Sequence, residues 1–184
     1  MEYGPIEFLI GQWESEGWSG ENKAPDPDRK EENTRFRQIM EFIPIGLVEN
    51  HEQALWVLRY STAAWEKDGD ENPFHQEVGY FIWDNENKQL LKSFIVPRGI
   101  AVNAGGTVDD SESSFTLSAQ LENPVHGISS NPFLDKEFRT LQYNITFQKL
   151  DSNTFTYNEN TLIQIKGRES VFEHTEKNVM KRVK

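Results

Sequence analysis

Short segments in which apolar and polar residues alternate run through most of this chain. Alternation with a period of two residues is typical of half-buried β-strands. Turn-forming residues, such as Asp68-Gly69-Asp70 and Asn85-Glu86-Asn87, separate the segments. Strands are expected at Ile10–Trp18, Arg35–Ile45, Leu55–Glu66, Phe74–Asp84, Gln89–Val96, Ile100–Val108, Ser113–Leu121, Phe138–Leu150, Phe155–Ile165 and Val171–Val183.

The connections between these segments indicate the fold class. Most of them are short, so strands that follow each other along the chain should pair as hairpins. No helical segment is long enough for the crossover that a parallel sheet needs. The sequence therefore predicts an all-β protein with one domain over residues 1–184, a single antiparallel up-and-down barrel of about ten strands. A barrel of that size is wide enough to enclose a ligand.

Three segments fall outside this pattern. Residues Gly4 to Gly11 are expected to form a short helical turn that covers one end of the barrel, next to Trp13. Glu21 to Asn33 reads as a mobile charged loop, and Asn123 to Glu137 as a second long loop. The residues that could line the interior are Phe36, Met40, Phe42, Trp65, Phe81, Trp83, Phe94, Phe115 and Phe147.

Composition narrows the range of partners. The net charge of -11 would repel the phosphates of nucleic acids and anionic lipids, so neither is an expected partner. The chain has no cysteine, which excludes disulfides and thiolate chemistry and fits the cytoplasm. It also shows no signal peptide and no apolar run near the ~20 residues of a membrane span. A small hydrophobic ligand is the expected partner, and monomer and homodimer both remain open.

Three side chains are candidates for contact with such a ligand. His75 shares a strand face with Glu77, so it could either meet a ligand or form a structural pair with Glu77. Arg98 follows Pro97 at an expected bulge, where its guanidinium could bind a ligand carboxylate or an internal acid. His174 lies in the last expected strand, where it could be either a metal ligand or a structural residue of the barrel wall. His51 and His126 are interpreted as solvated loop residues.

Four short motifs, in order along the chain, resemble those of the nitrobindin family, also known as the THAP-type haem-binding domain. The first is Gly11-Gln12-Trp13-Glu14-Ser15-Glu16-Gly17, in which Ser15 replaces a family glycine. The second is His75-Gln76-Glu77-Val78-Gly79-Tyr80. The third runs from Pro97-Arg98-Gly99 to Ala104-Gly105-Gly106-Thr107. The fourth runs from Phe155-Thr156-Tyr157 to Phe172-Glu173-His174-Thr175. The departure at Ser15 and the long loops indicate a distant branch.

The resemblance implies a ten-stranded barrel, related in shape to lipocalins and fatty-acid-binding proteins, that holds haem b. By position, His174 matches the family's iron ligand and His75 matches a distal histidine. The resemblance also implies nitric oxide binding and the isomerisation of peroxynitrite to nitrate, so the chain is a candidate peroxynitrite isomerase. Two other interpretations remain open, which are a carrier or sensor of a fatty-acid-like carboxylate and a barrel that has lost haem.

Overall fold

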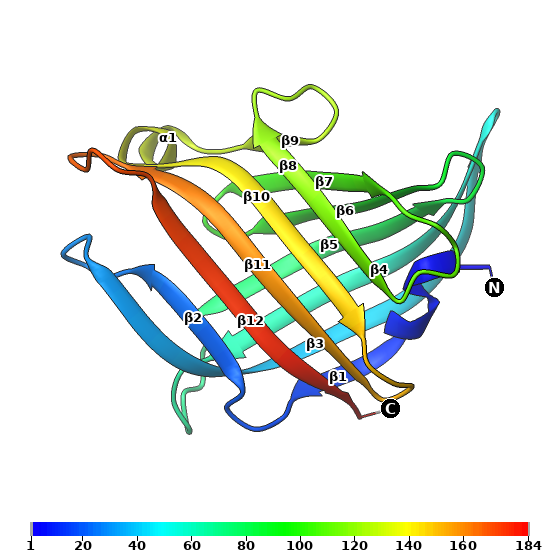
Figure 1. Ribbon diagram of the computed structural model, residues 1–184, viewed down its shortest axis with the longest axis horizontal. Helices are drawn as coiled ribbons and strands as arrows, with labels where there is room; N and C mark the ends of the chain where they lie inside the picture. The colour runs from blue at the N-terminus through cyan, green and yellow to red at the C-terminus, as the bar shows by residue number, and fades with distance from the viewer. Residues whose placement is uncertain (1, 184) are drawn as a thin grey trace.

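Residues 2–183, which the computed structural model describes, form twelve strands in one sheet whose two ends meet (Figure 1). The barrel closes because β12 pairs with both β1 and β2, and both of these also pair with β3. Neighbouring strands are antiparallel except for β8 and β9. The strands are β1 (Gly11–Ser15), β2 (Gly20–Pro25), β3 (Glu31–Asn50), β4 (Gln53–Trp65), β5 (His75–Asp84), β6 (Gln89–Val96), β7 (Ile100–Thr107), β8 (Ser114–Leu121), β9 (Gly127–Ser129), β10 (Phe138–Lys149), β11 (Thr154–Ile165) and β12 (Phe172–Arg182). The expected all-β barrel fold is confirmed.

The two expected long loops are the main errors of the sequence interpretation. Residues 21–33 are not a mobile loop, because β2 and the first part of β3 form a hairpin that also pairs with β12. Charged residues obscured this hairpin, since they lie on its outer face. The second segment contains β9 and a one-turn helix, α1 (Pro132–Glu137), whose first turn is capped by the Asn131 side chain.

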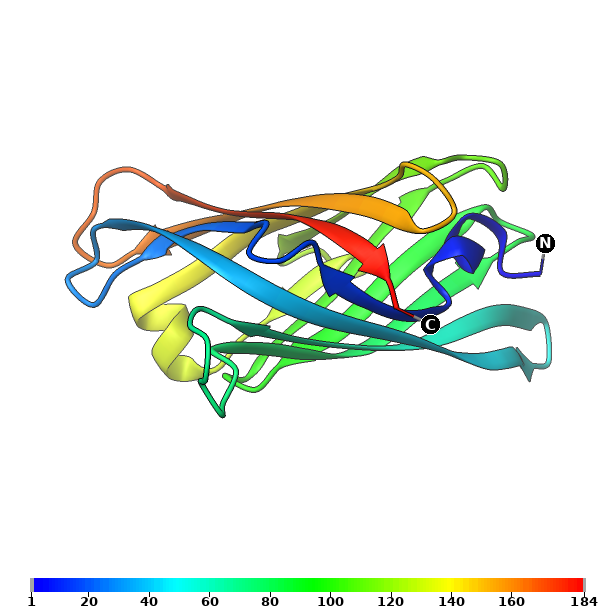
Figure 2. The same cartoon turned by 90° about the horizontal axis from the view of Figure 1, so that it is seen from below.

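The N-terminal turn closes one end of the barrel, as expected. It is a 3-10 helix, η1 (Gly4–Leu9), whose Ile6 and Leu9 are fully buried. Trp13 packs beneath it, and its indole Nε1 donates a hydrogen bond to the Leu9 carbonyl at 2.7 Å. Figure 2 shows η1 at one end of the barrel and α1 at the other. The end that carries α1 is called the open end below.

Aromatic side chains fill the half of the barrel nearest η1. The ring of Phe81 lies 5.5 Å from those of Phe42 and Phe147, and all three are buried. Such contacts stabilise a core beyond the area that they bury. Of the interior residues expected from the sequence, Trp65 alone is misplaced: it stacks with Arg37 at 4.4 Å and is only half-buried.

Gly79 on β5 gives the first testable prediction. It lies between the inward-facing Glu77 and Phe81, where an added Cβ would overlap the Ser93 carbonyl oxygen and lie 2.6 Å from the Phe94 Cα. Because these are backbone atoms, Gly79→Ala should lower the free energy of unfolding by about 1–3 kcal/mol. Chemical denaturation would measure this, with the exposed Gln76→Ala on the same strand as the control. Equal stability of Gly79→Ala and the wild type would contradict the packing described.

Candidate functional site

A cluster of polar and charged side chains occupies the barrel interior between the aromatic core and the open end. Inward-facing positions of five strands contribute one residue each: Glu77 (β5), Lys92 (β6), Tyr143 (β10), Glu159 (β11) and Glu176 (β12). Strand alternation requires the inward orientation, since each lies two residues from another interior side chain. Buried charges need partners, and the contacts of this cluster supply them.

Glu77 and Lys92 form the central ion pair. The Lys92 Nζ donates to the Glu77 Oε2 at 3.0 Å, and the hydroxyl of Tyr60 donates to the same oxygen at 2.8 Å. The His75 Nε2 lies 3.3 Å from the other carboxylate oxygen. Burial opposes ionisation of Glu77, but Lys92 and His75 outweigh it and hold the pKa of Glu77 at about 2. Glu77 is therefore ionised at neutral pH.

Lys92 also connects this pair to a second carboxyl group. Its Nζ donates to the Tyr143 hydroxyl at 2.8 Å, and that hydroxyl donates to the Glu159 Oε2 at 3.0 Å. Glu159 lies directly opposite Glu176 in the β11–β12 ladder. Burial raises the pKa of Glu159 to about 8, with Lys92 acting in the opposite direction and Glu176 in the same one. Glu159 therefore carries a proton at neutral pH.

Glu176 belongs to a network of hydrogen bonds around Tyr157. The Asn178 Oδ1 accepts from the Val179 N–H, so the Asn178 Nδ2 faces Gln38 and donates to its Oε1 at 3.1 Å. The Tyr157 hydroxyl has one proton and donates it to the same Gln38 Oε1 at 2.7 Å. The Tyr157 hydroxyl also contacts the Glu176 Oε1. Burial raises the pKa of Glu176, and the positive charge of His75 and the contact with Tyr157 act in the opposite direction.

Little space remains between these side chains. The cavity that they enclose together with Met40, Thr62 and Ile145 has a volume of about 10 Å³. That is about the space that one water molecule needs, whereas small-molecule sites usually have ~300 Å³ or more. The expected aromatic-lined cavity is therefore wrong at this level of the barrel, which has no room for a ligand of haem size.

The structure brings both candidate histidines to the open-end side of the carboxyl cluster. His75 begins β5 and His174 is the third residue of β12, one inward position nearer the open end than Glu176. Burial alone would lower the pKa of His75, but its contact with Glu77 outweighs burial and raises that pKa to about 9. Burial lowers the pKa of His174 to about 4, and the charges of His75 and Lys23 act in the same direction. A cationic and a neutral imidazole thus share the interior.

The structure does not bring Arg98 into this group. Pro97, Arg98 and Gly99 form an exposed hairpin turn between β6 and β7, not a bulge, and the Gly99 N–H donates to the Val96 carbonyl at 2.9 Å. The Arg98 carbonyl accepts from the Asn131 side chain at 2.6 Å. The inward-facing guanidinium expected from the sequence is therefore wrong, because a tight turn replaces the bulge that would have redirected it.

The other two histidines differ from each other. His51 is exposed in the β3–β4 turn, as expected. The ring of His126 is half-buried and packs on Gly105, where a Cβ would leave no room for it. The interpretation of His126 as a solvated loop residue is therefore wrong. Neither histidine lies among the residues that line the polar cluster.

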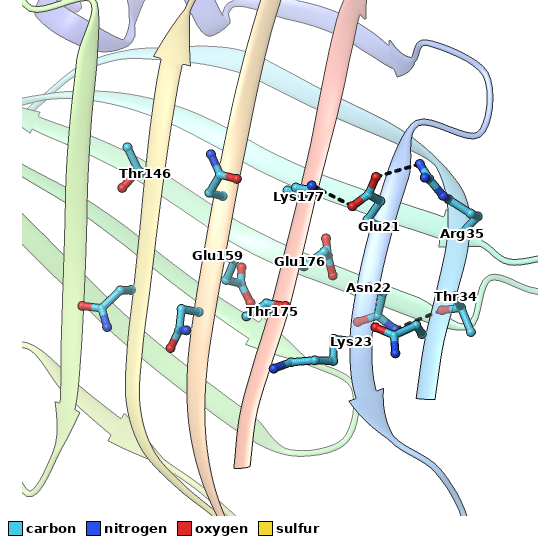
Figure 3. A pocket seen from close by; sticks show the side chains of 14 residues that line it. Glu21, Asn22, Lys23, Thr34, Arg35, Thr146, Glu159, Thr175, Glu176 and Lys177 are labelled. Atoms are coloured by element: carbon cyan, nitrogen blue, oxygen red, sulfur yellow. Dashed lines mark hydrogen bonds and ion pairs between the residues drawn. The ribbon is translucent and has the colours of Figure 1, made fainter. Parts of the chain in front are cut away.

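A wider hollow of about 680 Å³ lies over β2, β11 and β12 (Figure 3). Most of its lining side chains alternate with the inward-facing residues and therefore point outward. Three of the charged side chains on it are paired: the Glu21 carboxylate contacts the Lys177 Nζ at 2.7 Å and the Arg35 Nη1 at 2.9 Å. It is a polar surface, and Glu159 and Glu176 of the interior cluster also line it.

The interior cluster predicts a loss of stability at alkaline pH. Glu159 and His75 keep protons in the folded state that the unfolded chain loses near its ordinary pKa values of 4.5 and 6.5. Above pH 6.5 the unfolded chain has lost both protons. The folded protein keeps the proton of Glu159 up to a pH of about 8 and that of His75 up to about 9, so rising pH lowers the free energy of unfolding over this range. The charged or titratable side chains around Glu159 and His75 include Glu77, Lys92, Glu176 and His174.

Chemical denaturation between pH 6.5 and 9 should therefore show a falling free energy of unfolding in the wild-type protein. Glu159→Gln keeps the shape of a neutral carboxyl group and should show a smaller fall. Identical pH profiles for the variant and the wild type would show that Glu159 is already ionised when folded.

The sequence interpretation did not identify several members of the cluster, although the sequence carries a signal for some of them. Lys92 lies between Leu90 and Phe94 at inward positions of an alternating strand, where a charge is unusual. Glu159 follows Phe155 and Tyr157 in the same way. Asn22, whose Oδ1 lies 3.0 Å from the His174 Nε2, gives no such signal, because residues 21–33 were interpreted as a loop.

Two comparisons with known proteins agree with this description of a closed β-barrel. The model of the THAP4-like, heme-binding beta-barrel domain family matches residues 2–182. Among solved structures, that of Rv2717c from M. tuberculosis is similar with a TM-score of 0.63 and 17% sequence identity, over 97% of this chain and 95% of that chain. This likeness concerns the fold. No curated protein matches the chain.

The fold and the family model together define a β-barrel of a ligand-binding class. Because the family model covers nearly the whole chain, the protein belongs to the THAP4-like haem-binding β-barrel domain family. The described residues include no helix that is long and apolar enough to cross a membrane.

Proposed function

We propose that this protein binds haem b in the open-end half of the barrel, with His174 as the axial ligand. The observation that carries the proposal is a neutral imidazole inside the barrel, on the last strand of a chain that belongs to a haem-binding family. Neutral imidazole is the form that ligates a metal. With a pKa of about 4, His174 offers it without first losing a proton at physiological pH.

The residues around His174 fit this role on chemical grounds. The His174 Nε2 lies 3.0 Å from the Asn22 Oδ1, and ligating histidines commonly use their second nitrogen in such a contact. The carboxyl cluster forms the floor of the site, since its cavity of about 10 Å³ admits nothing larger than water. When bound, haem would supply an iron centre for small ligands, and the protein supplies the axial ligand and the surroundings.

We extend the proposal to nitric oxide binding and to peroxynitrite isomerisation, on the basis of the family resemblance. His75 supports this extension, because its cationic ring lies near His174 and would attract an anion such as peroxynitrite. His75→Leu should retain haem and convert peroxynitrite to nitrate more slowly than the wild type. Equal nitrate yields and rates would remove His75 from this role.

The fatty-acid carrier has less support. The expected anchor for a fatty-acid carboxylate, Arg98, is exposed in a turn. The buried ammonium group of Lys92, which could replace it, is already paired with Glu77. Titration with ferric haem and with a fluorescent fatty acid separates the two functions. The proposal expects a saturable change in the haem visible spectrum near one equivalent and no displacement by the fatty acid. Fatty-acid binding without a haem spectrum would favour the carrier.

A further inference from the structure

The outer surface of the barrel differs in character from one wall to the other. In Figure 1, β4–β7 form the wall behind β11 and β12. On the side of β8 and β10, outward side chains carry hydroxyl and amide groups: the hydroxyls of Thr116 and Thr146 share a hydrogen bond at 2.8 Å, and the Ser118 hydroxyl donates to the Asn144 Oδ1 at 2.8 Å. None of the exposed large hydrophobic side chains of residues 2–183 lies on β8, β10, β11 or β12. These strands have the outer face expected of a wall that only meets water.

The wall of β4–β7 has a different outer face. Val78 and Tyr80 on β5, Ile95 on β6 and Val125 in the loop after β8 are between 47% and 63% exposed. All four line one hollow of about 940 Å³, which lies over β4–β7 and is flanked by the segment from Glu122 to Ser129. Single exposed apolar residues are ordinary, but a contiguous group of them marks an interaction surface. We call this surface the apolar wall.

We propose that the apolar wall binds the apolar wall of a second copy of this chain, in a two-fold symmetric dimer. Glu41 and Arg59 select this occupant. Both line the hollow from exposed outward positions, on β3 and β4, and neither forms an ion pair within residues 2–183. The remaining charged residue of the lining, Glu122, contacts Arg139 at 3.5 Å.

One free charge of each sign makes the apolar wall complementary to itself. In a two-fold symmetric interface, a residue i that contacts j of the other copy is matched by j contacting i. Arg59 of each copy can therefore meet Glu41 of the partner subunit, which gives two equivalent ion pairs. The chain as a whole carries a net charge of -11, so copies repel each other except where they meet at a surface of balanced charge. An anionic lipid surface would be repelled for the same reason.

The size and rigidity of the apolar wall also suit a protein partner. The hollow is lined by 20 residues, and each side of a standard protein interface contributes about 20–30. Val125 is held in place, because its carbonyl accepts from the Asn103 Nδ2 at 2.8 Å and its N–H donates to the Asn123 Oδ1 at 2.9 Å. A surface that is already ordered loses less entropy on binding. Because the apolar wall faces away from the barrel interior, the inference does not rest on haem binding.

Sedimentation velocity of the haem-free protein, over a series of protein concentrations, tests the apolar wall. The wild type should sediment as a dimer that dissociates on dilution. Val78→Asp would bury an unpaired carboxylate twice in the interface and should weaken association at least ~100-fold. Gln148→Asp, at an exposed outward position of β10, is the matched control and should associate as the wild type does. A wild type that is monomeric at every concentration, or equal association of Val78→Asp and the wild type, would overturn the proposal.

Reversing the charges tests the identity of the partner, and it keeps the proposal open to refutation if Val78→Asp does not fold. Glu41→Arg and Arg59→Glu each place like charges against each other and should weaken self-association about 10–100-fold. An equimolar mixture of the two variants pairs a copy that has two arginines with a copy that has two glutamates, and should recover a dimer. Circular dichroism of each variant checks that the barrel is intact. Folded variants that self-associate as the wild type does, or a mixture that stays monomeric, would contradict the two ion pairs.

Discussion

Replacing Glu77 by alanine is expected to lower the free energy of unfolding by about 3–5 kcal/mol. The substitution would leave the Lys92 ammonium, which is 1% exposed, without its carboxylate partner. Tyr60 and His75 would lose an acceptor at the same time. An unpaired buried charge is among the most destabilising defects in a protein interior, because water no longer solvates it. Equilibrium chemical denaturation at neutral pH measures the loss.

Two further variants make this result specific. Glu173→Ala, at an exposed position on β12, should change stability by less than about 0.5 kcal/mol. The double variant Glu77→Leu with Lys92→Met removes both charges and should be more stable than Glu77→Ala. A cost below about 1 kcal/mol for Glu77→Ala, or a double variant less stable than the single one, would contradict the buried ion pair.

The sequence carries most of the information that specifies the barrel. Alternation and turn residues predicted the strands from Arg35 to the C-terminus except β9, and the apolar residues around Trp13 predicted the closed end. The hairpin of β2 and β3 could not be predicted in the same way. Its outward positions hold Glu21, Lys23 and Arg35, so its composition resembles that of a solvated loop, and its pairing with β12 joins segments about 150 residues apart.

The site was predictable only in part for the same reason. His75 and Glu77 share a strand face, so their pairing follows from local geometry. The contact of His174 with Asn22, and those of Lys92 with Glu77 and Tyr143, depend on which strands become neighbours in the closed barrel. Arg98 was a plausible interior residue only if it lay in a bulge. Because the structure has a tight turn there, its side chain lies at the surface.

His174→Ala is expected to abolish the binding of ferric haem while the barrel stays folded. The strand pairs through backbone groups, so β12 should remain in the sheet. The lost hydrogen bond to Asn22 should cost about 1 kcal/mol of stability, within the usual range for point substitutions. His51→Ala, which changes an exposed histidine in a turn, is the matched control and should bind haem as the wild type does.

The most direct test of the proposed function is the visible absorption spectrum of the protein during titration with ferric haem, recorded for the wild type and for His174→Ala. The proposed function predicts a saturating spectrum of histidine-ligated haem in the wild type and only the spectrum of free haem in the variant. Either a wild-type protein that leaves the free-haem spectrum unchanged, or a folded His174→Ala protein that gives the wild-type spectrum, would contradict it.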